Sequence, residues 1–156
     1  METPPTTFSQ PVGVRWADLD PNGHVRHSVY YDWGAMVRLA YLETKGVGVS
    51  WLSANAIGPV LFREEARFLR EIRFGDQVEV DLRLAGTSLD GRKWRIRHRL
   101  LRGSEELALI EVDGAWLDLR VRKIVTPPEA LVAAFPDSLR SEDFVVLPSG
   151  KPGSPK

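Results

Sequence analysis

Two acids and two histidines lie close together in the segment from Trp16 to Ser28. Asp18 and Asp20 precede a Pro-Asn-Gly turn, and His24 and His27 follow it. A helical pattern begins directly after this segment. The N-terminus of a helix has unpaired N–H groups and a partial positive charge, so it can bind a developing oxyanion. A carboxylate nearby can act as a general base for water or as a nucleophile on a carbonyl. The segment therefore contains both parts of an acyl-transfer site.

The helical pattern extends from Val29 to Lys45. Apolar residues recur with the spacing of a helical stripe, and most of the other positions are apolar as well. A helix that is apolar on most sides is usually buried. We expect Ser28 to cap its N-terminus, Asp32 to lie in its first turn and Gly46 to end it.

Segments that alternate with a period of two follow this helix, as is typical of strands with one face on a core. The four long strands predicted are Val60–Phe74, Val78–Leu84, Trp94–Leu100 and about Leu107–Val121, and a short strand is expected at Gly13–Trp16, before the helix. Turn signals at residues 75–76, 89–91 and 102–104 predict hairpins, and therefore an antiparallel sheet. A short helix should run from Pro127 to Phe135.

A single sheet with one apolar face can bury a mostly apolar helix by curling around it. The element order therefore predicts an α+β hotdog fold, an antiparallel sheet wrapped around one long central helix. The 156 residues suit one domain. We expect a flexible N-terminal tail at 1–11, the folded domain at 12–139 and a C-terminal extension, mostly tail, at 140–156.

Composition excludes several classes of protein. The 21 basic and 21 acidic residues balance, so we expect no nucleic-acid partner. No apolar run is long enough to span a bilayer. The absence of cysteine excludes disulfides, thiolate metal sites and a cysteine nucleophile, and it fits a cytoplasmic location. The three histidines show no His-x-x-x-His arrangement, so no metal site is expected.

The segment Asp18-x-Asp20-Pro21-x-Gly23-His24-Val25, followed by an aromatic-rich helix, resembles the 4-hydroxybenzoyl-CoA thioesterase family of hotdog acyl-CoA thioesterases. The stretch that ends in Phe74-Gly75-Asp76 is similar to the end of the family's second strand. The resemblance spans about Val12 to Leu131. It implies a homodimer or homotetramer that hydrolyses an acyl-CoA thioester, with coenzyme A as part of the substrate and no other cofactor.

The resemblance also implies roles for individual residues. The second acid of the Asp-x-Asp pair is catalytic in the family, which corresponds to Asp20, and some members carry a histidine where His27 stands. Arg26-His27 departs from the more common Asn-Asn. The residues predicted to bind substrate are His24, Tyr30, Trp33, Glu64, Arg92 and Lys93. The residues alone allow simpler interpretations: Asp20 can merely hold its turn, His24 can fix the loop, and His27 can assist the base, contact the thioester or pack.

Glu64 is the least expected residue of the predicted sheet, because it falls on the inward, apolar face of a strand. A carboxylate there must be paired, neutralised or facing a cavity. It can pair with Arg70 on the same face or line the acyl pocket, or a bulge can turn it outward. Arg92 and Lys93 belong to a charged row that is most simply a solvated strand face, although both can meet coenzyme A phosphates. His98 is expected to be a core or interface histidine.

Two other functions are compatible with the same fold. An acyl carrier protein can replace coenzyme A as the acyl donor, which a basic rim around the pocket would favour. A non-catalytic acyl-CoA-binding protein is the third possibility, and the unusual Arg26-His27 and Glu64 give it some weight.

Overall fold

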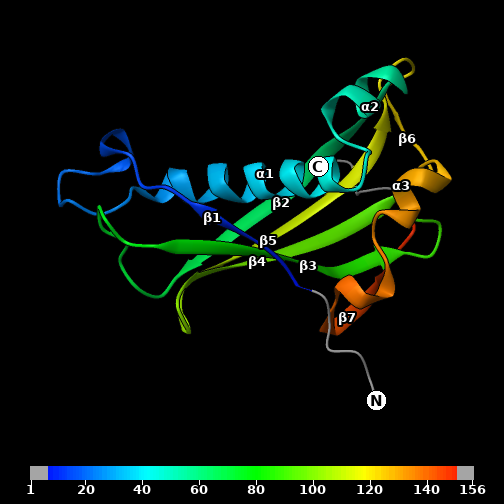
Figure 1. Cartoon of the computed structure of the whole chain (residues 1–156). Coiled ribbons are helices and arrows are strands. Elements are labelled where there is room, and N and C mark those ends of the chain that lie inside the picture. Colours follow the sequence, from blue (N-terminus) through cyan, green and yellow to red (C-terminus); the bar gives the residue numbers. More distant parts are fainter. Residues whose placement is uncertain (1–6, 151–156) are drawn as a thin grey trace, which may run out of the picture.

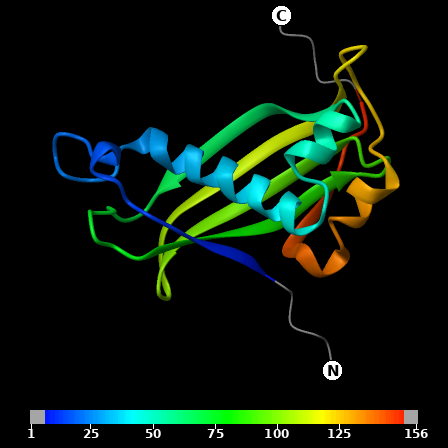
Figure 2. The same cartoon turned by 45° about the horizontal axis from the view of Figure 1, so that its top comes forward.

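A computed structural model describes residues 7–150, which form one sheet curled around a long helix (Figure 1). The helices are α1 (His27–Thr44), α2 (Val49–Ala54) and α3 (Glu129–Ala133), with short 3-10 turns at Trp16–Asp18 and Asp137–Leu139. The strands are β1 (Phe8–Val12), β2 (Ile57–Phe68), β3 (Val78–Ser88), β4 (Lys93–Arg102), β5 (Glu105–Asp118), β6 (Lys123–Ile124) and β7 (Arg140–Leu147). Both views show α1 lying across one face of the sheet (Figures 1 and 2). This arrangement confirms the predicted α+β hotdog fold.

The order of the strands is β1-β3-β4-β5-β2, with β6 beside β5 and β7 beside β3. All pairs are antiparallel except β3 with β7. The expected hairpin between β2 and β3 is wrong, because β2 pairs with β5 on the far side of the sheet. A period-two pattern shows which face of a strand is buried, but it does not show which strand lies beside it.

The long helix α1 is buried along most of its length, as expected. Its core side chains are Val29, Tyr30, Trp33, Val37, Tyr41 and Leu42. It begins two residues earlier than predicted, so Arg26 is the N-cap and Ser28 lies inside the first turn. Asp32 is therefore beyond that turn. Gly46 follows the helix with a φ of 71°, a left-handed conformation that glycine adopts without strain and that commonly ends a helix.

Strand β2 contains a bulge whose position the sequence does not reveal. The pairing with β5 shifts between Leu61 and Arg63, so Phe62 is the extra residue. The side chains of Glu64, Ala66 and Phe68 point toward α1, as predicted. Before the bulge, however, it is Leu61 that points toward α1, since it lies opposite Gly114 on the inner face. The strand ends at Phe68, so the predicted continuation to residue 74 is a loop.

Both ends of the domain extend further than expected. The first strand is Phe8–Val12, inside the expected tail, and the predicted strand at Gly13–Trp16 is a loop and a 3-10 turn. Strand β7 lies in the expected C-terminal extension. It pairs with the half of β3 that β1 leaves uncovered, so it protects an otherwise open sheet edge. Residues 1–6 and 151–156, also expected to be tails, lie outside the described residues.

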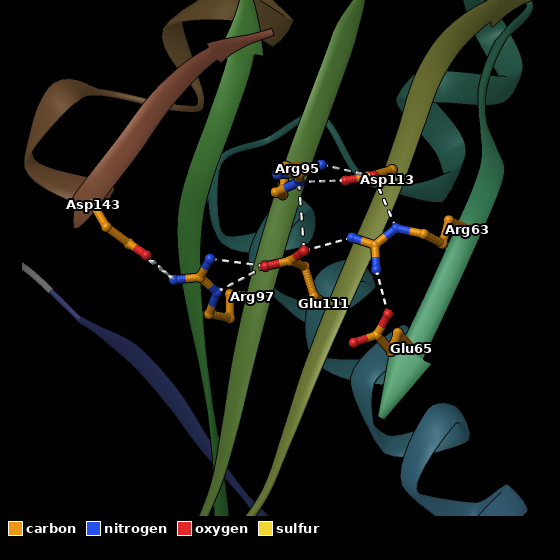
Figure 3. Close-up of polar contacts among 7 residues, drawn as sticks. All are labelled: Arg63, Glu65, Arg95, Arg97, Glu111, Asp113 and Asp143. Carbon is orange, nitrogen blue, oxygen red and sulfur yellow. Dashed lines mark hydrogen bonds and ion pairs between the residues drawn. The ribbon is translucent and has the colours of Figure 1, made fainter. Parts of the chain in front are cut away.

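The outer face of the sheet carries a network of ion pairs (Figure 3). Arg97 donates to Glu111 at 2.7 Å, Arg95 donates to Asp113 at 2.6 Å, and Arg63 of β2 bonds to both acids. Asp143 of β7 also bonds to Arg97. Burial raises the pKa of Asp113, but hydrogen bonds from Arg95 and Arg63 lower that pKa by more, so it lies below its usual value. The network joins four strands, and networks stabilise a surface more than isolated pairs do.

Only a glycine fits at position 114, because the ring of Trp94 packs against it from the opposite position on the inner face of the sheet. A Cβ atom at Gly114 would lie 2.5 Å from the carbonyl oxygen of Val60 and closer still to the Trp94 ring. We therefore expect Gly114→Ala to lower the free energy of unfolding by about 1–3 kcal/mol, measured by urea denaturation. Gly13→Ala is the control, because nothing lies within 4 Å of that position. Equal stability of the two variants would contradict the packing described here.

Candidate functional site

A cavity of about 650 Å³ lies at the N-terminus of α1. Its wall joins four parts of the chain: the loop that precedes α1, the start of α1, the end of β2 with the loop that follows it, and the far end of β4. The residues that line it are Asp20, His24, Val25, His27, Tyr30, Phe68, Leu69, Arg70, Glu71, Arg73, Asp76 and Arg102. Four residues predicted for the site therefore share one cavity: Asp20, His24, His27 and Tyr30.

Asp20 is held in place through only one of its carboxylate oxygens. Oδ1 accepts hydrogen bonds from the backbone N–H of Asn22 at 2.8 Å and of His24 at 3.1 Å. Within residues 7–150, Oδ2 has no hydrogen-bond partner. The Asx turn predicted as the simpler interpretation is therefore present. It leaves one oxygen of a half-buried carboxylate available to a ligand or to water.

His27 is the first residue of α1, and its side chain is exposed in the wall of the cavity. The backbone N–H groups of His27 and Ser28 have no acceptor inside the helix, because the first turn lacks preceding carbonyls. Together with the partial positive charge of this helix end, they can bind an oxyanion. The exposed His27 side chain makes no hydrogen bond within the described part of the chain.

Hydrogen bonds to the loop after β2 fix the loop that precedes α1. The Val25 N–H donates to the Ile72 carbonyl at 2.7 Å, and His24 forms a bridge with Arg73. The His24 ring lies 3.1 Å from the Glu71 carboxylate, measured from Nε2 to Oε2. These contacts position the loop, in agreement with the structural interpretation of His24.

Asp18 holds the start of the same loop. It is fully buried, and its carboxylate accepts hydrogen bonds from the backbone and guanidinium of Arg15, the shortest at 2.7 Å. The hydrogen bond from Arg15 lowers the pKa of Asp18 below its usual range. Its backbone carbonyl accepts from the Arg26 N–H at 2.8 Å. Asp18 therefore orders the loop and does not line the cavity, whereas Asp20 does.

Tyr30 and Phe68 form an aromatic wall of the cavity. Their rings meet edge to face with centroids 4.9 Å apart. Burial raises the pKa of the Tyr30 hydroxyl, and the nearby charges of Asp20 and Glu71 raise it further. Trp33 is buried behind this wall, with its ring 5.9 Å from that of Tyr30. It supports Tyr30 and is not among the residues that line the cavity.

Like Trp33, three other predicted binding residues do not line the cavity: Glu64, Arg92 and Lys93. Lys93 begins β4 and Arg92 directly precedes it, whereas Arg102, at the end of β4, lines the cavity. Nine steps along a strand span about 30 Å. Arg92 instead bonds to Thr126, and Lys93 to the carbonyl of Gly150. Glu64 points inward, but its partner is not Arg70.

Glu64 pairs with Arg38 of α1 at 3.3 Å. Sequence reasoning missed Arg38, and the signal was a single arginine within the otherwise apolar stretch from Trp33 to Leu42 of the helix. Arg70 pairs with Glu105 instead. Phe68 and Arg102 were also missed, because the expected strand continued past Phe68 and nothing local marked Arg102.

No helix within residues 7–150 is long and apolar enough to cross a membrane. Over the same residues, no group of three or more histidine, aspartate or glutamate side chains could hold a metal ion.

The chain is similar to several known proteins. It is 27% identical over 134 residues to the acyl-acyl carrier protein thioesterase ATL3, chloroplastic, of Arabidopsis thaliana. The matched region covers 85% of this chain and 69% of that protein. Many solved structures share the fold, among them two thioesterase-fold examples of similar length. The 1,4-dihydroxy-2-naphthoyl-CoA thioesterase Slr0204 of Synechocystis has a TM-score of 0.75 and 18% identity, over 85% of this chain and 97% of that one. SAV2348 of Staphylococcus aureus, solved in complex with CoA, has a TM-score of 0.78 and 16% identity, over 95% and 99%.

A family model also matches most of the chain. The model of the thioesterase-like superfamily covers residues 14–135. This range contains the loop that carries Asp20, the long helix and strands β2 to β6, and it includes every residue that lines the cavity. The chain therefore belongs to the thioesterase-like superfamily.

Proposed function

We propose that this protein hydrolyses acyl-CoA thioesters, as the 4-hydroxybenzoyl-CoA thioesterase group does, with Asp20 as the catalytic carboxylate. One observation carries the proposal: Asp20, which has one carboxylate oxygen without a hydrogen bond within residues 7–150, lines a cavity of about 650 Å³ together with His27, the first residue of α1. A base and an oxyanion site at one cavity are what hydrolysis of a thioester requires. The superfamily and the CoA complex of SAV2348 agree with a CoA-linked substrate.

In the proposed reaction, the thioester carbonyl oxygen faces the first backbone N–H groups of α1. Asp20 takes a proton from water while the water oxygen bonds to the carbonyl carbon. The tetrahedral intermediate then collapses, the bond between carbon and sulfur breaks, and coenzyme A leaves as a thiolate that gains a proton. Alternatively, Asp20 attacks the carbonyl directly, the bond between carbon and sulfur breaks, and coenzyme A leaves as a thiolate that gains a proton. Water then hydrolyses the mixed anhydride, which frees the Asp20 carboxylate and releases the acid. No cofactor enters either route.

The other residues of the cavity support this reaction. His27 is exposed and makes no hydrogen bond within residues 7–150, so it can donate the proton that the leaving thiolate needs. His24 is held by Glu71 and positions the loop, and Tyr30 supports the acyl group. Arg70 and Arg73 on the rim are largely exposed and pair only with exposed or half-exposed carboxylates. They can exchange these partners for CoA phosphates.

A homodimer, or a homotetramer built from two dimers, is part of the proposal. Within the described residues no strand pairs with the outer edge of β2, and exposed edges are usually paired or covered. A second copy that pairs there would form a continuous sheet.

An acyl carrier protein is the second candidate for the acyl donor, because the Arabidopsis relative is named for that substrate. A basic rim would favour such an acidic partner. Here each arginine of the cavity wall pairs with a carboxylate, as Arg102 does with Asp76 at 2.7 Å. The balanced rim therefore offers an acidic carrier protein no excess of positive charge.

Side-by-side assays of thiol release test both donors. We expect hydrolysis of acyl-CoA to exceed that of the same acyl group on an acyl carrier protein by tenfold or more in kcat/KM. The acyl panel should contain short, long and aromatic groups. The reverse preference would mean that the acyl carrier protein, and not coenzyme A, is the acyl donor. Tight binding of acyl-CoA without thiol release would instead show a non-catalytic binding protein.

A further inference from the structure

A second cavity lies between the middle of α1 and the sheet. Its volume is about 290 Å³, and its wall is apolar at almost every position, including Leu39, Leu42, Leu61, Trp94 and Phe135. Arg38 is the one charged residue that lines it. The side chain of Arg38 is only 12% exposed. A buried guanidinium in an apolar wall requires an explanation, because burying a charge is costly unless it is paired and hydrogen-bonded.

Two neighbours hold the Arg38 guanidinium. Its Nη1 lies 3.1 Å from Nε2 of His98, and its Nη2 lies 3.3 Å from Oε2 of Glu64. Nδ1 of His98 lies 2.7 Å from the carbonyl oxygen of Asp81. A carbonyl only accepts, so Nδ1 carries the hydrogen. Nε2 of the neutral ring then accepts from Arg38.

Polar groups in or beside this cavity lack hydrogen-bond partners. Within residues 7–150, neither Nε of Arg38 nor Oε1 of Glu64 makes a hydrogen bond. The indole N–H of Trp94, which is 4% exposed, also has no partner. Buried polar groups are normally satisfied, so the indole N–H of Trp94 points to a missing partner. The free atoms of Arg38 and Glu64, whose side chains are 12% and 22% exposed, are open to a ligand or to water. A hydroxyl is the group that fits best, because it accepts from Arg38 and donates to Glu64. A carboxylate would be repelled by the charge of Glu64.

This second cavity opens along the same seam as the cavity that contains Asp20. Leu61 and Phe68 of β2 point toward α1, yet they are 45% and 48% exposed, so the space between β2 and α1 is open. Phe68 lines the first cavity and Leu61 the second. The Arg38 guanidinium lies beside Gly34, where an added Cβ would be 3.4 Å from Nη1. Gly34 is seven residues beyond His27, or about 10 Å along the helix axis.

We propose that the cavity lined by Arg38, whose guanidinium pairs with Glu64, selects acyl groups that carry a hydroxyl about 10 Å from the thioester carbonyl. The inference rests on the proposed thioesterase function and names the class of acyl group for it. The Arg38–Glu64 pair is neutral as a whole, so it binds a neutral polar group and discriminates against both a plain chain and an anionic one.

Binding of unreactive analogues tests this selection without relying on turnover. The probes are thioethers of coenzyme A with an octyl, an 8-hydroxyoctyl or a 7-carboxyheptyl chain, and titration calorimetry measures their Kd. We expect the hydroxylated analogue to bind about tenfold more tightly than the octyl analogue. Glu64→Gln should reduce this ratio and improve binding of the carboxylated analogue. Glu65→Gln, on the outer face of the same strand, should change neither. A merely structural effect would change the Kd of all three analogues alike, whatever group ends the acyl chain.

The outcomes separate this inference from the proposed function. Equal affinity for the hydroxylated and octyl analogues, or no binding of either, overturns the selection even if acyl-CoA is hydrolysed. An unchanged ratio in Glu64→Gln also overturns it. Selective binding of the hydroxylated analogue with no hydrolysis of the matching thioester would leave this inference standing and contradict the thioesterase function.

Discussion

Asp20→Asn is expected to lower kcat/KM for acyl-CoA by about 10²–10⁴-fold, the usual contribution of general acid–base catalysis. An asparagine cannot take a proton from water or attack a carbonyl. Its amide oxygen can still accept the hydrogen bonds that Asn22 and His24 donate to Oδ1 of Asp20, so the loop should keep its conformation. Thiol release in the steady state measures the effect.

Two comparisons make this result specific. Unfolding in urea should show that Asp20→Asn is as stable as the unmodified protein. Asp18→Asn should instead lower stability, because the buried Asp18 carboxylate would lose its charge-assisted bonds to Arg15. Turnover of Asp20→Asn within a factor of two of the unmodified protein would remove Asp20 from the catalytic role.

Acid should destabilise the protein through His98. Burial lowers the pKa of His98, the charge of Arg38 lowers it further, and the pKa is about 3 in spite of the opposing bond to Asp81. An unfolded histidine titrates near pH 6.5. Between these values the unfolded state binds a proton that the folded state does not, so stability is fully present above about pH 6.5 and falls as pH decreases. The expected loss from this group is about 2 kcal/mol between pH 7 and pH 5.

Urea denaturation at several pH values measures this slope. His98→Gln removes the titrating group, so stability should depend less on pH over this range, whatever the absolute stability of the variant. Gly114→Ala is the matched control, because it is expected to lower stability without removing a titrating group and should retain the original slope. Identical slopes for His98→Gln and the unmodified protein would mean that His98 is not held neutral by its surroundings.

The sequence predicted the parts of the fold that depend on short-range patterns. Side chains alternate along a strand and repeat every 3.6 residues along a helix, so the buried faces of β3, β4 and β5 and the burial of α1 could be read directly. The pairing of β2 with β5 could not, because it joins segments about 50 residues apart, such as Arg63 and Asp113. The bulge at Phe62 was also hidden, since it arises only against a partner strand.

The candidate site, like the fold, could be predicted from the sequence only in part. Asp20, His24 and His27 lie within eight residues of one another, so the sequence alone placed them together before a helix. Which oxygen of Asp20 remains free depends on the turn geometry, and which side chains complete the cavity depends on where β2 and β4 end. Phe68 and Arg102 therefore became visible only in the structure.

Glu64 shows the difference most clearly. Its position in the alternating pattern determined that a carboxylate faces the core, and the cost of burying a charge required a partner for it. The identity of that partner was decided by tertiary packing, because Arg38 lies on a helix 26 residues earlier in the chain. Periodicity assigns a side chain to a face, but only the packing of α1 against β2 and β4 brings Arg38, His98 and Glu64 together.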